Sequence, residues 1–181
     1  MLGTGTPIPT PNRSGPATAI VVNGKAYIVD FGPGVVRRAA EVSKEYGGPI
    51  NALNVDQLGI AFLTHLHHDH SAGLPDLVYT SWTHGRENAF ELFGPPGTAA
   101  MASNVAEAWQ EDNRYRLYGL EPATPSGWKI NAHEIEEGVV YRDERVTVEA
   151  FKVKHGTGPN AFAYKFTTPD KVIVISGDAA Y

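Results

Sequence analysis

The sequence predicts an α/β fold of the α+β kind, in which two β-sheets pack face to face and helices cover the outside, an αββα sandwich. Strand-like runs fall in two regions of the chain, helical patterns lie between them, and no linker, repeat or low-complexity segment divides the sequence. A chain of 181 residues with 42% hydrophobic content is long enough to bury its own core. We therefore expect residues 1–181 to form a single domain.

Each expected element has a local signal. Two β-rich runs are separated by Asn23 and Gly24, a dipeptide that supplies the positive φ angles of a two-residue hairpin turn. After Pro33, apolar residues recur at helical spacing, and the glycines and proline at 47–49 end the pattern. The expected elements are, in chain order, strands at 17–22 and 25–31, a helix after Pro33, a strand at 59–63, a helix at 74–83, a strand at 89–93, a helix at 98–112, and strands at 139–142, 146–153, 161–167 and 171–175.

The composition limits the possible partners. The formal net charge of −5 gives no overall basic footprint, which argues against binding nucleic acid through the whole surface. The absence of cysteine excludes disulfides and thiolate ligands. No apolar run approaches the roughly 18 residues that span a bilayer, and no signal-peptide pattern opens the chain. We expect no membrane partner, and the localisation stays open between the cytoplasm and a mature exported form.

The segment from His65 to His70 is the most informative part of the sequence, because it places four of the chain's seven histidines and one aspartate within six positions. It follows the apolar run 59–63, which reads as a buried strand, and precedes a helix. Side chains two apart in an extended stretch point the same way, so His65 and His67 can bind one metal ion. Asp69 and His70, at the turn into the helix, can then reach a second ion.

Other histidines have simpler explanations. A lone histidine is more often a surface or core residue than a ligand, so we do not expect His84 or His133 to bind metal. His68 stands at the variable position of the cluster and is not expected to be a ligand. A histidine-rich solvated tract would not lie between Phe-Leu and Gly-Leu-Pro.

The pattern H-x-H-x-D-H resembles the histidine signature of the metallo-β-lactamase superfamily of hydrolases. Residues 2–7, 13–18, 30–34 and 94–97 are similar to the subgroup that holds ribonuclease Z, a tRNA 3′-processing endonuclease, and the arylsulfatase-like hydrolases. The resemblance covers nearly the whole chain. It implies a metallo-β-lactamase-type αββα sandwich and a dinuclear metal site that uses a metal-bound hydroxide as nucleophile.

The resemblance also implies further site residues. His155, after the strand-like run 146–153, matches the histidine that completes the first metal site with His65 and His67. Asp178, after the aliphatic run 172–175, matches the carboxylate that bridges both metals, although a plain Gly-Asp turn is the alternative reading. Asp69 would ligate the second ion and act as the catalytic residue that orients the nucleophile or accepts its proton. The implied cofactor is one or two Zn²⁺ per chain, with Mn²⁺ or Fe²⁺ possible. Class B β-lactamases typically use Cys or His at the bridging position, so antibiotic hydrolysis is disfavoured.

Several residues near these motifs have weaker signals. Asp30 resembles the family's aspartate that hydrogen-bonds the histidine loop. Trp82 and His84 are candidates for the substrate mouth, although packing in the core is the more common role of a tryptophan. Arg86 is a candidate clamp for an anionic substrate, against the simpler reading of a solvated arginine at a helix end. The Gly3-Thr4-Gly5 segment could cradle an anion or form a tight turn.

The leading functional hypothesis is a metal-dependent hydrolase of small anionic esters, arylsulfatase-like or phosphodiesterase-like. The alternative is ribonuclease Z, whose members carry an arm insertion that grips tRNA. Between Tyr118 and Val139 there is only a short loop that is neither long nor basic, and the net charge of −5 predicts weak tRNA binding. A further alternative is a non-catalytic, metal-binding fragment that self-associates.

The end of the chain departs from the family pattern. Three residues follow Asp178, whereas the family continues through an αβ segment to a final histidine of the second metal site, and Ala179 stands where Thr or Ser is usual. We therefore expect a C-terminally incomplete chain with a nearly complete first site, a deficient second site and about one tightly held metal. An exposed edge and an uncovered apolar face of the second sheet would then favour a homo-oligomer.

Overall fold

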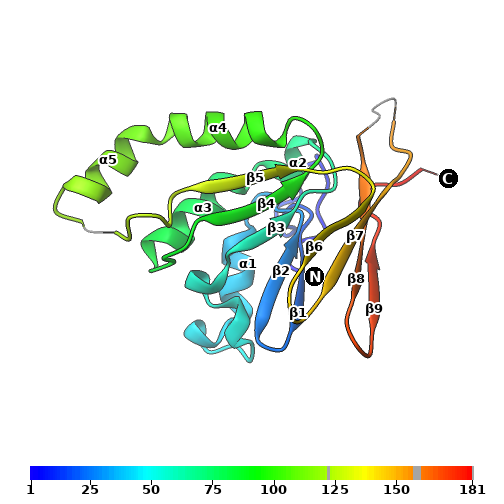
Figure 1. Ribbon diagram of the computed structural model, residues 1–181. Helices are drawn as coiled ribbons and strands as arrows, with labels where there is room; N and C mark the ends of the chain where they lie inside the picture. The colour runs from blue at the N-terminus through cyan, green and yellow to red at the C-terminus, as the bar shows by residue number, and fades with distance from the viewer. Residues whose placement is uncertain (122, 157–159, 181) are drawn as a thin grey trace.

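The computed structural model describes residues 1–121, 123–156 and 160–180, and it contains two facing β-sheets (Figure 1). The five-stranded sheet has the order β1-β2-β3-β4-β5, and the four-stranded sheet has the order β6-β7-β8-β9. The strands are β1 (Thr18–Val22), β2 (Lys25–Val29), β3 (Ile60–Phe62), β4 (Phe90–Gly94), β5 (Ile130–Glu134), β6 (Gly138–Arg142), β7 (Thr147–Lys152), β8 (Phe162–Thr167) and β9 (Val172–Ile175).

The pairing follows from the connections. Strands β1 and β2 form an antiparallel hairpin, and Asn23 and Gly24 adopt the predicted positive φ angles of 46° and 79°. Strands β2, β3, β4 and β5 are parallel, because helical segments connect them, and the second sheet is entirely antiparallel. The helices are α1 (Val35–Val42), α2 (His68–Ser71), α3 (Leu74–Thr83), α4 (Thr98–Ala108) and α5 (Gln110–Tyr118), with 3₁₀ turns η1 (Lys44–Tyr46), η2 (Asn51–Leu53) and η3 (Val55–Gln57).

Two separate cores stabilise these layers. One lies between the first sheet and its helices, where Val35, Val36 and Ala39 of α1 are fully buried or nearly so. The other lies between the sheets and is rich in aromatic rings. Phe62 of β3 is fully buried there, and its ring centroid lies 5.1 Å from that of Phe93 and 5.4 Å from that of Tyr164. The strand β3 is thus buried on both faces, which explains its continuous apolar sequence.

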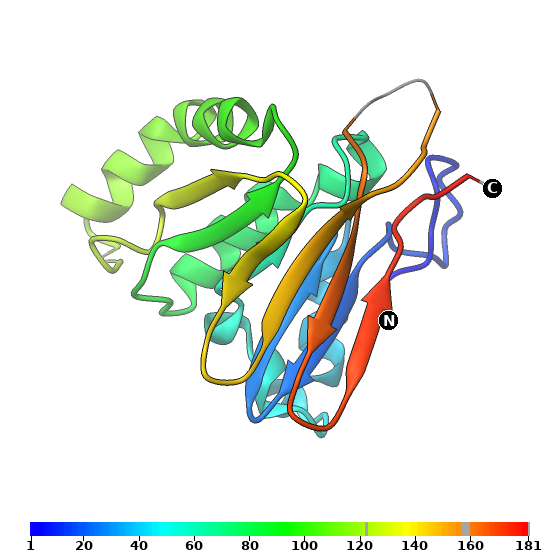
Figure 2. The same ribbon diagram turned by 45° about the vertical axis from the view of Figure 1, so that its right-hand side comes forward.

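The outer face of the second sheet differs from that of the first. Figure 2 shows this face without a helix over it, within the part of the chain that the structure describes. Val172 and Val174 of the edge strand β9 are each 59% exposed. Among residues 1–121, 123–156 and 160–180, the expected sandwich is therefore present with helices on the outside of the first sheet only.

Three local predictions were wrong. The helix expected at 98–112 is two helices, α4 and α5, which break at Trp109, whose ring stacks on Tyr79 of α3. Strand β5 was not predicted, because its exposed pattern lacks a continuous apolar face. Asp69 and His70, expected at the turn into the next helix, lie within a separate short helix, α2. None of the helices described is long and apolar enough to cross a membrane.

Candidate metal centre

The histidine loop begins at the carboxyl end of the central strand β3. Leu63 donates its backbone N–H to the Phe93 carbonyl of β4, so the chain stays attached to the sheet up to Leu63. Tyr164 of β8 donates its hydroxyl to the Leu63 carbonyl at 2.7 Å from the opposite sheet. The loop is therefore fixed by both sheets before the first histidine.

The structure brings His65, His67 and His155 together. The Nε2 atom of His65 lies 3.0 Å from Nδ1 of His67, and Nε2 of His155 lies 3.3 Å from the same Nδ1. Two nitrogens bound to one tetrahedral zinc ion at about 2.0–2.1 Å would stand about 3.3 Å apart. The donor set and its spacing therefore fit a divalent metal ion. His65 and His67 follow β3 of the first sheet, and His155 follows β7 of the second.

A second group of donors shares a residue with the first. Ligand atoms of His65, His70 and Asp178 lie within 4.8 Å of one another. Nε2 of His70 is 3.5 Å from Asp178 Oδ1 and 3.7 Å from Asp69 Oδ2. Asp69 is buried beside this group, whereas the Asp178 side chain is half exposed. All six residues expected as ligands thus lie around one region at the end of the sandwich.

Asp30 orients the loop, as its resemblance to the family implied. Its Oδ2 lies 2.8 Å from Nδ1 of His70, and its Oδ1 accepts the backbone N–H of Thr64 at 2.8 Å. Asp30 adopts a φ of 58°, which is uncommon for a residue other than glycine, and is only 4% exposed. No sequence motif pointed to Thr64, whose buried hydroxyl contacts both Asp30 and His65.

Burial and charge shift the histidines in opposite directions. Burial, together with the neighbouring imidazoles of His70, His155 and His67, lowers the pKa of His65 to about 4. Burial also acts to lower the pKa of His70, but the hydrogen bond and negative charge of Asp30 outweigh it and raise this pKa. The neutral imidazole of His65 at ordinary pH is the form that binds a metal ion.

The two candidates for the substrate mouth, Trp82 and His84, lie away from the metal donors, and the other two histidines have separate surroundings. Trp82 is 1% exposed in the core between helices and sheet and donates Nε1–H to the Thr124 carbonyl, so it packs in the core, the more common role, rather than at a substrate mouth. His84 lies at the exposed end of α3, and its Nδ1 pairs with the Thr80 carbonyl. His133 is paired with Glu91, whose Oε2 lies 2.7 Å from Nε2 of His133. His68 is exposed, and within the described residues it belongs to neither group of metal donors.

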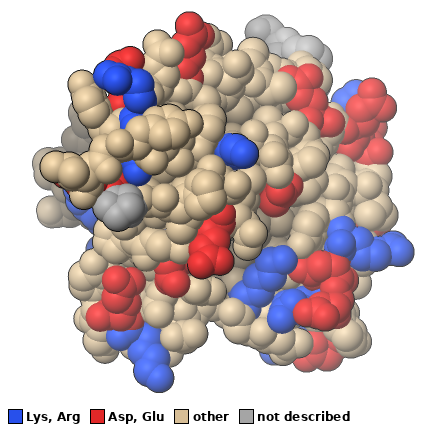
Figure 3. All heavy atoms as spheres, turned by 60° about the vertical axis from the view of Figure 1, so that its left-hand side comes forward, with Lys and Arg blue, Asp and Glu red and all other residues tan. Residues whose placement is uncertain are grey.

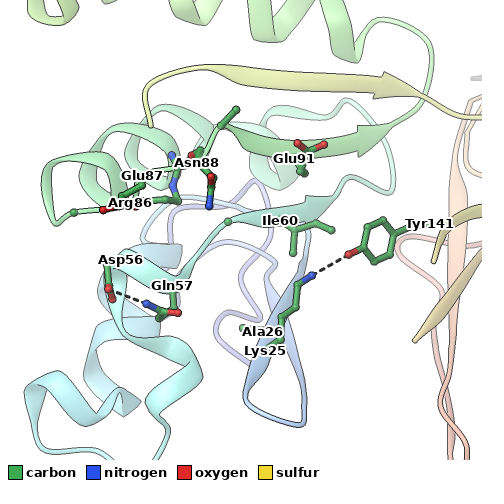
Figure 4. Close-up of a pocket in the computed structure, with 13 residues that line it drawn as sticks. Lys25, Ala26, Asp56, Gln57, Ile60, Arg86, Glu87, Asn88, Glu91 and Tyr141 are labelled. Atoms are coloured by element: carbon green, nitrogen blue, oxygen red, sulfur yellow. Dashed lines mark hydrogen bonds between the residues drawn. The ribbon is translucent and has the colours of Figure 1, made fainter. Parts of the chain in front are cut away.

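Arg86 does not clamp an anion at the metal centre. It is 5% exposed and donates to the carbonyls of Val78 and Asn88, and burial lowers its pKa to about 10. It lines a polar pocket of about 510 Å³ together with Lys25 and Tyr141 (Figure 4). None of the six expected metal ligands lines this pocket. The arginine instead satisfies carbonyls near the end of α3.

Known proteins are similar to this chain in sequence and in fold. The family model of the metallo-beta-lactamase superfamily matches residues 10–181. The chain therefore belongs to the metallo-beta-lactamase superfamily, as its histidine signature predicted.

Within the superfamily, the chain is similar to enzymes named ribonuclease Z. It is 33% identical over 180 residues to the ribonuclease Z of Mycobacterium sp. (strain KMS), an alignment that covers 98% of this chain and 60% of the relative. It is 32% identical over 182 residues to that of Mycobacterium bovis (strain BCG / Pasteur 1173P2), with 98% and 61% covered. The chain thus spans about 60% of the length of these curated relatives.

Solved structures share the fold at lower identity. The short form of human tRNase Z superposes with a TM-score of 0.74 at 22% identity, over 98% of this chain and 67% of that one. A metallo-beta-lactamase fold protein from Bacillus subtilis gives a TM-score of 0.65 at 17% identity, over 99% and 62%. These likenesses confirm the predicted architecture.

Proposed function

We propose that this chain carries the metal centre of a ribonuclease Z-type hydrolase that cleaves a phosphodiester bond of RNA. The convergence of His65, His67 and His155 beside His70, Asp69 and Asp178 carries the proposal. Similarity to enzymes named ribonuclease Z over 98% of the chain supports this alternative over the small-ester hydrolysis placed first by the sequence analysis.

The proposed cofactor is Zn²⁺, with Mn²⁺ or Fe²⁺ as possible replacements. His65, His67 and His155 would hold one ion, and Asp69, His70 and Asp178 would hold a second. When bound, such ions lower the pKa of water towards 7 and screen negative charge on a phosphoryl group.

Each residue then has a distinct task. Asp69, buried beside His70, would accept a proton at a carboxylate oxygen, because its Oδ2 faces the same space as Nε2 of His70. Asp178 approaches His70 from the second sheet and would join the two donor groups. Asp30 forms a hydrogen bond with Nδ1 of His70, so Nε2 is the nitrogen that would be directed at a bound metal ion.

The surface charge bears on the substrate. Lys and Arg alternate with Asp and Glu on the face in Figure 3, and the net charge of this chain is −5. Because the net charge is −5, this chain should bind tRNA weakly, and small anionic esters are the second candidate substrates.

A substrate comparison tests the proposal. Purified chain reconstituted with Zn²⁺ should cleave a precursor tRNA at its 3′ side and a chromogenic phosphodiester, and Asp69→Asn should abolish both reactions. Turnover of aryl sulfates with no cleavage of either phosphodiester would favour the small-ester alternative. If the metal-loaded chain hydrolyses none of these substrates, the result would support the alternative of a non-catalytic, metal-binding chain.

We also propose that this chain self-associates through β9. Within the described residues, β9 has a strand neighbour on one side only, and Val172, Ile173 and Val174 are exposed on it. An edge of this kind pairs readily with a second copy, because its backbone N–H and C=O groups are unpaired and its side chains are apolar on both faces.

A further inference from the structure

Thr64 occupies the junction between the central strand and the metal ligands. It is 1% exposed, directly precedes His65, and is held from both sheets. Its backbone N–H donates to Asp30 Oδ1 at 2.8 Å, and its carbonyl accepts the N–H of Phe162 in β8 at 2.9 Å. The backbone of Thr64 is therefore fixed on both sides, which limits the groups that its side chain can reach.

The hydroxyl of Thr64 contacts two groups, but it has only one hydrogen to donate. Its Oγ1 is 2.9 Å from Asp30 Oδ2 and 3.0 Å from His65 Nδ1. An ionised carboxylate can only accept, so the hydroxyl donates to Asp30 and accepts the Nδ1–H of His65. This order places the hydrogen of His65 on Nδ1 and leaves the lone pair on Nε2, the atom that faces His67.

The same carboxylate also serves the second donor group. Asp30 Oδ2, which receives the Thr64 hydroxyl, lies 2.8 Å from Nδ1 of His70. One oxygen is thus connected to His65 through Thr64 and to His70 directly. The orientation of both imidazoles depends on one short chain of buried hydrogen bonds.

Thr64 also packs against the segment that carries Asp178. A Cβ atom built on Gly177 would lie 2.7 Å from the Cβ and 2.9 Å from the Cγ2 of Thr64. Gly177 has a φ of 59°, so a side chain there would be disfavoured by the backbone as well as by the contact. Only a glycine allows the chain to pass this close to Thr64 on its way to Asp178.

We propose that Thr64 is a positioning residue for both donor groups: its hydroxyl fixes the tautomer of His65, and its carbon atoms fix the approach of Asp178. The inference deepens the proposed function and rests on the metal centre described there. It requires no contact between Thr64 and a metal ion or a substrate.

The test compares Thr64→Val, which keeps the shape and removes the hydroxyl, with Thr64→Ser, which keeps the hydroxyl. Zn²⁺ affinity by calorimetry should fall about 10- to 100-fold in Thr64→Val, the usual loss when the hydrogen-bond partner of a ligand histidine is removed. Thr64→Ser should stay within about threefold of the unsubstituted chain. Circular dichroism of each metal-free variant checks the fold.

Nitrogen-15 NMR of the histidine rings supplies a readout that a purely structural role would not change. In the metal-free protein, the neutral ring of His65 should carry its hydrogen on Nδ1. Thr64→Val should give a mixture of the Nδ1–H and Nε2–H tautomers of His65, whereas Thr64→Ser should keep the Nδ1–H tautomer. Gly177→Ala should weaken the second metal-binding event, because its Cβ would lie 2.7 Å from the Cβ and 2.9 Å from the Cγ2 and Oγ1 of Thr64.

The outcomes separate the two proposals. If Thr64→Val folds and binds Zn²⁺ as tightly as the unsubstituted chain, with the same tautomer, the role of Thr64 is refuted and the metal centre stands. If the unsubstituted chain binds no Zn²⁺, the proposed function and the role of Thr64 are both overturned.

Discussion

Asp143 should be a major source of stability because it joins the two sheets. Its Oδ2 accepts hydrogen bonds from the hydroxyl of Tyr27 at 2.6 Å and from Nζ of Lys25 at 2.9 Å, both on the first sheet. The hydroxyl of Tyr141 donates to it as well, and its Oδ1 accepts the backbone N–H of Arg145 and Val146. This carboxylate therefore connects β2 to the β6–β7 turn.

The expected cost of Asp143→Ala follows from these partners. Tyr27 is fully buried, so its unpaired hydroxyl should cost about 1–3 kcal/mol, and the lost bonds to the turn add about 1 kcal/mol. The side chain of Lys25 is 36% exposed and adds little, because solvent replaces its partner. The free energy of unfolding should fall by about 2–4 kcal/mol in Asp143→Ala. It should fall by less in Asp143→Asn, which keeps one acceptor oxygen.

The hydrogen bonds from Tyr27 and Lys25 hold the pKa of Asp143 below its usual range, although burial opposes them. A carboxylate whose pKa is depressed on folding contributes stability that is fully present above its unfolded pKa of about 3.9 and is lost as the pH falls through the folded value. Urea unfolding of the metal-free chain at pH 7 and pH 3 should show this loss, and Asp143→Asn should reduce it. A change below about 1 kcal/mol at pH 7 in Asp143→Ala would refute the reasoning.

Two further predictions concern the packing and the exposed edge. Phe62→Ala should lower the free energy of unfolding by about 3–5 kcal/mol in urea titrations, because it leaves a cavity between the sheets; a loss near 1 kcal/mol would mean that the sheets close over it. Val174→Lys should shift the chain from oligomer to monomer in light scattering, because it places a charge on the outer face of β9, whereas Val139→Lys on the opposite edge strand β6 serves as the matched control. Equal oligomer size in both variants would exclude pairing through β9.

The parts of the site with a local pattern were predictable from the sequence. His65, His67, Asp69 and His70 fall within six positions, and resemblance supplied His155 and Asp178, which the structure places beside them.

The missed features depend on contacts between distant segments. Thr64 orients His65 only because Asp30 lies next to it in the folded chain, 34 residues away in sequence. The sequence left Arg86 open between an anion clamp and a solvated arginine at a helix end, but the fold buries it against carbonyls near α3. The break at Trp109 depends on a tertiary contact with Tyr79, which helical periodicity does not encode.

Metal content measured by plasma emission tests the central claim most directly. His67→Ala should lose most of the bound Zn²⁺, because Nδ1 of His67 faces both His65 and His155. His68→Ala, at the exposed neighbouring position, should retain it and the phosphodiesterase activity that depends on it. Zinc content in His67→Ala equal to that of His68→Ala would contradict the assignment of the metal centre.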